Sequence, residues 1–179
     1  SAGAEVSQQY VPIATKAGAV VIDNTSQFRY QEDIPLVVPE VNKEAIDSHT
    51  NHSIIANPNC STIQLTCSLA PLQQEFGLEL VNVVTFQSVS GSGQKGIEEL
   101  ESQSKECSLG QEPTPQLYDK PIAFNILPAI GPIDSWGHCE EEIKMVRETR
   151  KILNLPNLNM MATTTRSSIR GKAFIKKEF

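Results

Sequence analysis

Residues 54–64 read IIANPNCSTIQ, and this stretch decides how the rest of the sequence is interpreted. The apolar residues 54–56 predict a short buried strand that breaks at Pro58. Apolar positions then recur at helical spacing, at Leu65, Leu69, Leu72 and Phe76. Cys60 is therefore predicted to lie on a strand-to-helix turn, where unpaired backbone amides and the positive end of the helix dipole favour a thiolate. A thiolate attacks carbonyl carbon, so Cys60 is the candidate nucleophile.

A buried structural cysteine is the alternative interpretation of Cys60, because free cysteine is among the most buried residue types. The neighbouring residues argue against burial, since Asn-Pro-Asn precedes Cys60 and Ser-Thr follows it. These residue types form turns more often than they fill a core.

The composition is ordinary for a globular protein of 179 residues with a net charge of −6. This charge argues against nucleic acid as a partner. No apolar run reaches the roughly 20 residues of a membrane span and no signal peptide is recognised, so a cytoplasmic location is expected. Four irregularly spaced cysteines predict neither a zinc site nor a disulfide framework, and His49 and His52 have no ligand pattern around them, so no metal is expected.

The remaining elements follow from hydrophobic periodicity. A helix at about 5–17 leads into a buried parallel strand at 19–23, and this single unit implies that sequence N-terminal to it is missing. The alternating residues 80–87 predict a strand that ends at Gln87 on the face of Val81. Residues 140–153 predict an amphipathic helix whose charges are mostly solvated.

Two features of the sequence concern proline and glycine. Pro71 is expected to kink or restart the helix that begins at Cys60, and Gly77 is expected to end it. Residues 91–96, GSGQKG, match the letters of a dinucleotide-binding loop. The chain then enters the Glu-, Gln- and Ser-rich residues 98–112 instead of a second strand, so these glycines are not expected to form such a loop.

The motif at 57–62, NPNCST, resembles the nucleophile motif of the aspartate-semialdehyde dehydrogenase family. Further segments resemble that family in the same order and extend the likeness over most of residues 1–166: SAG at 1–3, NTSQFR at 24–29, IPLVVPEVN at 34–42, SVSGSG at 88–93, AFN at 123–125 and MATTTR at 161–166.

The resemblance implies an α/β chain. It implies the tail of a Rossmann-like, NADP-binding domain over residues 1–28, followed over 29–179 by an α+β substrate and dimerisation domain with a mixed sheet, incomplete at its C-terminal end. The implied reaction is the reversible, NADPH-dependent reductive dephosphorylation of L-aspartyl-4-phosphate to L-aspartate 4-semialdehyde through a thioester on Cys60. The implied ligands are this small substrate, phosphate and NADP, and the implied assembly is a homodimer or homotetramer.

The resemblance also assigns roles to residues. Cys60 and Gln87 are the implied catalytic residues, with Gln87 orienting the substrate. Five residues are implied for substrate binding: Arg29, Asn59, Glu141, Lys144 and Arg166. Of these, Arg29 and Lys144 would hold phosphate, Glu141 the amino group and Arg166 the α-carboxylate. Five residues are implied for cofactor binding: Ser1, Ala2, Gly3, Ser90 and Gly91.

Each role has a structural alternative. Arg29 could be a solvated surface residue. Glu141 and Lys144 could form a surface ion pair of little energetic value. Gln87 could cap a loop with its amide.

Position 173 is the main departure from the family, because it holds Ala where the family has its general acid/base His. This segment alone is therefore expected to be inactive. Two alternative functions follow, namely a related acyl-phosphate reductase and a truncated, non-catalytic dimerisation module.

Overall fold

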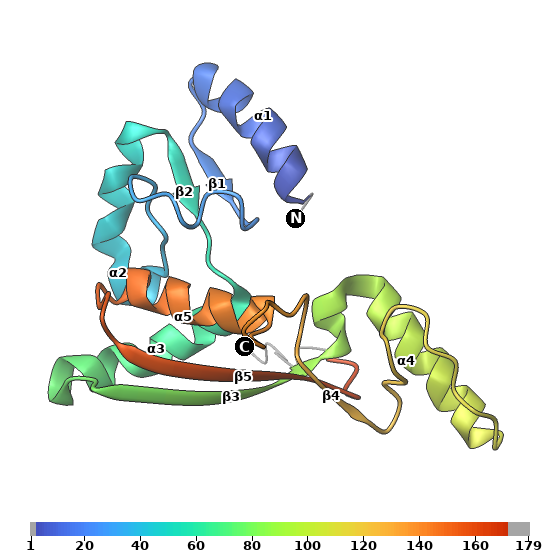
Figure 1. Ribbon diagram of the computed structural model, residues 1–179. Helices are drawn as coiled ribbons and strands as arrows, with labels where there is room; N and C mark the ends of the chain where they lie inside the picture. The colour runs from blue at the N-terminus through green and yellow to red at the C-terminus, as the bar shows by residue number, and fades with distance from the viewer. Residues whose placement is uncertain (1–2, 172–179) are drawn as a thin grey trace, which may run out of the picture. The chain divides into compact units, whose positions relative to one another are not determined.

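The structure is a computed structural model that describes residues 3–171 (Figure 1). Contacts divide the chain into two compact units. The first contains the residues up to Asn82 together with Ile143–Met161, and the second contains Val83–Glu142 and the residues from Ala162 onward. The predicted domain boundary after residue 28 is a different kind of division and stays a prediction.

The first unit is built around two parallel strands. Helix α1 (Ala4–Lys16) leads into β1 (Val21–Asp23), which pairs in parallel with β2 (Ile54–Ala56). Between the strands lie the short helix α2 (Pro39–Asn42) and the 3-10 helix η1 (Lys43–Asn51). The strand predictions at both places are confirmed, but β1 is not buried as expected, because Ile22 is exposed. The core of this unit consists of Val11, Phe28, Ile34, Leu36, Val38, Ile54, Ala56 and Ile152.

Helix α3 (Cys60–Phe76) begins at Cys60, as predicted. It runs through Pro71 without a restart and ends at Gly77, whose φ of 74° only glycine adopts without strain. The predicted apolar stripe is partly wrong, because Leu72 and Phe76 are exposed. The buried face carries Thr62, Thr66, Leu69 and Ala70 instead.

The second sheet has the strand order β3-β5-β4 (Figure 1). Its residues 83–88, 126–128 and 162–167 belong to the second unit. These strands are β3 (Leu80–Ser88), β4 (Ile126–Pro128) and β5 (Asn159–Ser167), and β4 pairs antiparallel with β5 so that Leu127 opposes Arg166. Burial alternates along β3 as predicted, with Val81 buried, while Val84 and Phe86 on the other face are exposed. The chain is thus α/β, with parallel pairing in one sheet and antiparallel pairing in the other.

The glycines of residues 91–96 have packing roles. The 3-10 helix η2 (Val89–Ser92) leads directly into α4 (Gly93–Ser108). A Cβ atom on Gly96 would lie 2.6 Å from the carbonyl oxygen of Val89 and 2.8 Å from the Tyr118 hydroxyl. Glycine at position 96 therefore lets α4 pack closely against its neighbours.

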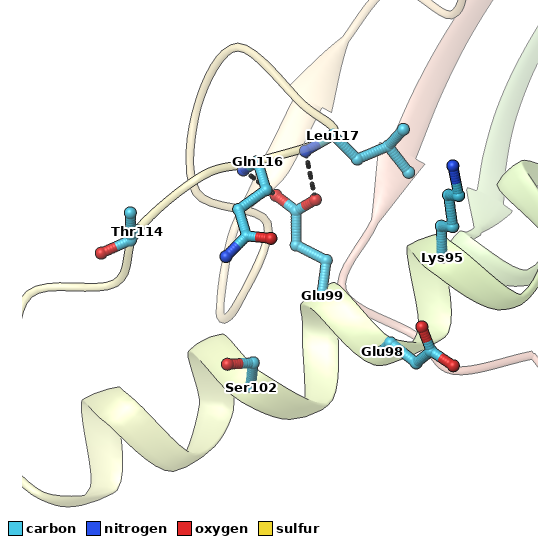
Figure 2. Close-up of a pocket in the computed structure, with 7 residues that line it drawn as sticks. All are labelled: Lys95, Glu98, Glu99, Ser102, Thr114, Gln116 and Leu117. Atoms are coloured by element: carbon cyan, nitrogen blue, oxygen red, sulfur yellow. Dashed lines mark hydrogen bonds between the residues drawn. The ribbon is translucent and has the colours of Figure 1, made fainter.

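Polar side chains of α4 hold the loop that follows it (Figure 2). The buried carboxylate of Glu99 accepts hydrogen bonds from the backbone amides of Gln116 and Leu117. Gln103 is fully buried and accepts from the amides of Ile122 and Ala123. The pocket drawn in Figure 2 is lined by seven residues, none of which is a predicted site residue.

Helix α5 (Glu140–Ile152) confirms the predicted amphipathic helix, but its charges are not all solvated. Glu141 is 7% exposed and Glu148 is completely buried. The expectation of a solvated charge is therefore wrong for Glu148, whereas Glu141 is one of the residues for which a role other than a solvated charge was expected.

The described part of the chain contains neither a helix suited to a membrane nor a cluster of metal-ligating side chains. No helix within residues 3–171 has the length and apolar character needed to cross a bilayer. Within the same residues, no group of three or more His, Cys, Asp or Glu side chains could hold a metal ion.

Candidate active site

The turn that carries Cys60 is closed by Asn59, which caps helix α3. The Asn59 side-chain oxygen accepts hydrogen bonds from the backbone amides of Ser61 at 2.8 Å and Thr62 at 3.4 Å. Cys60 is the first helical residue and is exposed, so the alternative of a buried structural cysteine is wrong. Cys67 is also exposed, but it lies in the middle of α3, away from the helix terminus. Position on the helix, and not exposure, sets Cys60 apart.

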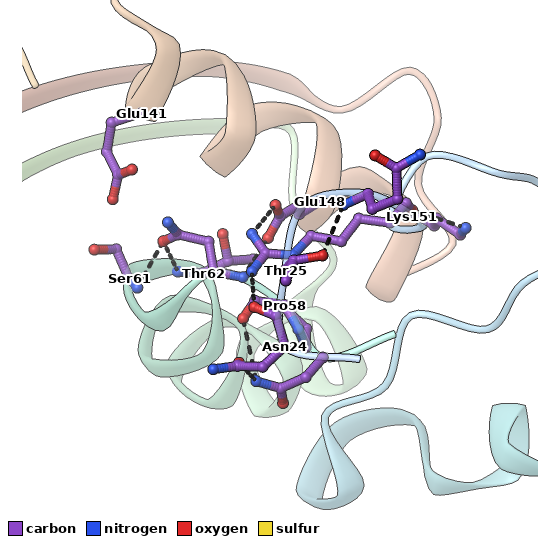
Figure 3. Close-up of polar contacts among 12 residues, drawn as sticks. Asn24, Thr25, Pro58, Ser61, Thr62, Glu141, Glu148 and Lys151 are labelled. Atoms are coloured by element: carbon purple, nitrogen blue, oxygen red, sulfur yellow. Dashed lines mark hydrogen bonds and ion pairs between the residues drawn. The ribbon is translucent and has the colours of Figure 1, made fainter. Parts of the chain in front are cut away.

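Glu148 contacts this turn from α5 (Figure 3). One carboxylate oxygen, Oε2, accepts a 2.7 Å hydrogen bond from the backbone amide of Asn59. The other, Oε1, accepts a 2.9 Å bond from Nη1 of Arg29. The second guanidinium nitrogen of Arg29 donates to the carbonyl oxygen of Asn24 at 3.0 Å. These residues form a buried polar cluster in the first unit.

Arg29 is not the surface residue that was its structural alternative. Its side chain is 8% exposed, so it is not a solvated surface residue. Its charge is neutralised by Glu148, whereas the resemblance implies a contact with phosphate. Sequence reasoning missed Glu148. The available signal was its position, because residue 148 lies three residues after Met145 and four before Ile152, on the apolar stripe of the helix.

Lys151 lies one turn beyond Glu148 and holds the loop that contains Arg29. Its ammonium donates to the carbonyl oxygens of Arg29 at 3.0 Å, Gln31 at 2.5 Å and Ile34 at 2.8 Å. Burial lowers the pKa of this ammonium from its ordinary value, and the nearby carboxylates of Asp33 and Glu32 act in the opposite direction. Helix α5 therefore fixes the Arg29 loop and the Cys60 turn with two adjacent turns.

In the second unit, the side chains of Gln87 and Glu141 contact each other. The Gln87 amide donates to Oε1 of Glu141 at 3.1 Å and to the Thr85 hydroxyl at 3.4 Å. These partners are side chains, so Gln87 does not cap a loop backbone. Because Glu141 is buried, the alternative of a surface carboxylate is wrong for this residue. Lys144 lies three residues further along α5 and is half-buried.

Arg166 is buried at the end of β5, with 6% of its surface exposed. Its Nη1 donates to the carbonyl oxygen of Ser88 at 2.6 Å. A Cβ atom on Gly91 would lie 2.6 Å from the same nitrogen, so glycine at 91 leaves the space that the guanidinium occupies. No carboxylate among the described residues forms an ion pair with Arg166.

The residues implied for cofactor binding are only partly described. Ser1 and Ala2 lie outside the described residues. Gly3 is the N-cap of α1 and has a φ of 99°. Ser90 is half-buried and its hydroxyl bonds to that of Ser88 at 2.8 Å, whereas Gly91 is exposed. Residues 90–91 belong to the 3-10 helix η2 and not to a loop, and the exposed Gly91 has no side chain to keep a ligand from the backbone.

The chain is similar to known proteins of one family. A family profile described as "Semialdehyde dehydrogenase, dimerisation domain" matches residues 69–170, and one described as "Semialdehyde dehydrogenase, NAD binding domain" matches residues 1–49. The aspartate-semialdehyde dehydrogenase of Shewanella sp. (strain DB6705) is 51% identical over 166 residues, which are 93% of this chain and 49% of that protein. The chain therefore spans about half the length of the relatives it matches.

Solved structures give the same result. Aspartate semialdehyde dehydrogenase II from Vibrio cholerae superposes with a TM-score of 0.93 at 50% identity, over 94% of this chain and 50% of that one, and a second structure of it is complexed with ASA. The enzyme of Candida albicans, solved with NADP, superposes with a TM-score of 0.69 at 25% identity, over 94% of this chain and 46% of that one. Because the dimerisation-domain match at residues 69–170 alone covers more than half of the 179 residues, the chain belongs to the semialdehyde dehydrogenase family.

Proposed function

We propose that this chain supplies the nucleophile and the substrate-binding residues of an NADPH-dependent aspartate-semialdehyde dehydrogenase. The reaction is the reversible conversion of L-aspartyl-4-phosphate to L-aspartate 4-semialdehyde and phosphate. The observation that carries the proposal is the exposed Cys60 at the first position of a helix whose terminal amides are capped by Asn59. The likeness to the Shewanella and Vibrio cholerae enzymes names the reaction.

The proposed chemistry begins with the Cys60 thiolate. It attacks the acyl carbon of the substrate, the bond from that carbon to the phosphate oxygen breaks, and phosphate leaves. The product of this step is a thioester on Cys60. NADPH, when bound, supplies the hydride that reduces this thioester. The carbon–sulfur bond then breaks, which releases the aldehyde and regenerates the thiolate.

The amino-acid end of the substrate is assigned to Arg166 and Glu141. Arg166 is a buried guanidinium that can form two parallel hydrogen bonds to a carboxylate, which suits the substrate α-carboxylate. Glu141 is a buried acceptor suited to the α-ammonium group, and its bond to Gln87 fixes its orientation. Gln87 and Asn59 are assigned to the surroundings of the reacting carbon.

The phosphate is assigned to Lys144 and Arg29. Lys144 offers an ammonium from the middle of α5. Arg29 would contact phosphate only with N–H groups that are not already directed at Glu148 or Asn24. NADP is assigned to Gly3, Ser90 and Gly91 together with Ser1 and Ala2. Support comes from the NAD-binding profile at residues 1–49, the NADP bound by the Candida albicans relative and the exposed Gly91 of η2.

A homodimer is the proposed assembly. Its support is the dimerisation-domain profile and the apolar side chains on the exposed face of β3 and β5, such as Val84, Phe86 and Met161. A tetramer built from such dimers is the larger form of the same proposal.

The test uses the full-length enzyme that contains this sequence. Oxidation of NADPH with L-aspartyl-4-phosphate is measured for the wild type, for Cys60→Ser and for the matched control Cys67→Ser. We expect turnover in the wild type and the control and at least a 10³-fold loss in Cys60→Ser, since the nucleophile is removed. Faster turnover with the acyl phosphate of a different amino acid, or an active Cys60→Ser variant, would overturn the assignment. Absence of turnover in the wild type would favour the non-catalytic alternative.

A further inference from the structure

The carboxylate of Glu148 joins two parts of the first unit that come from distant parts of the chain. Oε1 accepts from Nη1 of Arg29 at 2.9 Å, and Oε2 accepts from the backbone amide of Asn59 at 2.7 Å. The Glu148 side chain is 0% exposed. Both oxygens therefore make their contacts away from solvent, where each contact is strong and leaves little freedom.

Asn59 is held at two points because of this contact. Its side-chain oxygen accepts from the amides of Ser61 and Thr62, and its own backbone amide donates to Glu148. Cys60 lies between these groups in the sequence. The backbone on both sides of the candidate nucleophile is thus fixed, on one side by the helix cap and on the other by a charged hydrogen bond.

Stability alone does not account for a buried Arg29–Glu148 pair. Desolvation of two charges offsets much of their mutual attraction, and well-packed apolar residues are often as good in such a place. A directional requirement does account for it, because a carboxylate offers two acceptor oxygens at a fixed angle, one for the Arg29 guanidinium and one for the Asn59 backbone amide. The direction it fixes is that of the Pro58–Asn59 peptide, which immediately precedes Cys60.

We propose that Glu148 is a positioning residue whose carboxylate, neutralised by Arg29, fixes the backbone of Asn59 and thereby the direction of the Cys60 thiolate. The inference rests on the proposed function of Cys60 as the nucleophile. Misplacement of a reacting atom by about 1 Å can lower a rate about 100-fold, so a residue that never touches the substrate can control turnover in this way.

The experiment compares three variants of the full-length enzyme. Glu148→Leu removes both hydrogen bonds, Glu148→Gln keeps one acceptor oxygen but removes the charge, and Glu40→Gln changes an exposed glutamate of the same unit as the control. Two quantities are measured, namely kcat and the hydrogen–deuterium exchange rate of the peptide that covers residues 57–62. In Glu148→Leu we expect kcat to fall about 10- to 100-fold and exchange to become about tenfold faster. Glu148→Gln should be intermediate, and Glu40→Gln should match the wild type.

Two results would overturn the proposal. In the first, Glu148→Leu lowers the melting temperature but leaves kcat and exchange within twofold of the wild type, which would make the residue merely structural. In the second, only KM rises, which would mean that Glu148 serves Arg29 as a phosphate ligand and not the Cys60 turn. If Glu148→Leu does not fold, the same two criteria apply to the nearly isosteric Glu148→Gln. A wild type without turnover would remove the proposed function, whereas the exchange comparison would still test the tether to Asn59.

Discussion

Arg29 in the first unit and Arg166 in the second are buried to the same extent, with 6% of each residue exposed, but their charges are treated in opposite ways. Arg29 faces the buried carboxylate of Glu148. Arg166 bonds to the carbonyl oxygen of Ser88, and no carboxylate within residues 3–171 neutralises it. A buried cation is costly unless an anion compensates for it. The charge of Arg29 is thus paired within the protein, whereas that of Arg166 has no anion among the described residues, which agrees with its proposed role as a ligand of the substrate α-carboxylate.

The residues around the two guanidinium groups also differ. Arg29 is enclosed by its own loop, which Lys151 holds through three carbonyl oxygens. Arg166 has Gly91 beside it, and the missing side chain there leaves the space that the guanidinium occupies. Arg29 is therefore fixed by polar contacts around it, and Arg166 by close packing on a glycine.

The largest expected effect concerns the stability role of Arg29. Arg29→Met leaves the Glu148 carboxylate buried without its cation, which should lower the free energy of unfolding by about 3–5 kcal/mol. The double variant Arg29→Met/Glu148→Leu should recover most of this loss. Urea denaturation of the full-length enzyme measures both. An unfolding free energy of Arg29→Met equal to that of the wild type would break the comparison, because Arg29 would then not be the partner that Glu148 needs.

Arg166→Met should have the opposite profile, with a large loss of activity and little loss of stability. Truncation of one partner in a buried charge pair typically costs about 2–5 kcal/mol of binding, which corresponds to a fall in kcat/KM of roughly 30- to 5,000-fold. The control is Arg170→Met, because Arg170 belongs to the same unit and forms an exposed ion pair with Glu101. Steady-state kinetics and urea denaturation are measured on each variant. If Arg166→Met were destabilised as strongly as Arg29→Met, the two arginines would not differ in role.

The smallest expected effect tests the close packing of Gly91 on the Arg166 guanidinium. Gly91→Ala places a Cβ atom 2.6 Å from Nη1, so the guanidinium must move, and such overpacking costs about 1–3 kcal/mol. We expect KM for the acyl phosphate to rise about tenfold. In an Arg166→Met background the same substitution should change little, because the two residues act through one contact. Additive effects in the double variant would show that Gly91 acts independently of Arg166.

The features that the sequence predicted well depend on neighbouring residues. The turn at Cys60 follows from an apolar run, Pro58 and helical spacing, and the face of β3 that carries Gln87 follows from a period of two. The Arg29–Glu148 pair could not be predicted in this way, because its members are neighbours only in the folded chain. The exposure of Leu72 and Phe76 was missed for the same kind of reason, since periodicity shows which residues share a helix face but not whether anything covers it.

Asn59 and Glu148 lie 89 positions apart in the chain, so the contact between them can form only late in synthesis. A nascent chain leaves the ribosome from its N-terminus, so the Cys60 segment emerges long before helix α5. During that interval the cap of Asn59 can form locally, whereas the tether to Glu148 cannot. The Cys60 thiol therefore acquires its final direction only after helix α5 has been synthesised. In an incomplete nascent chain, Cys60 is exposed but its direction is not yet fixed.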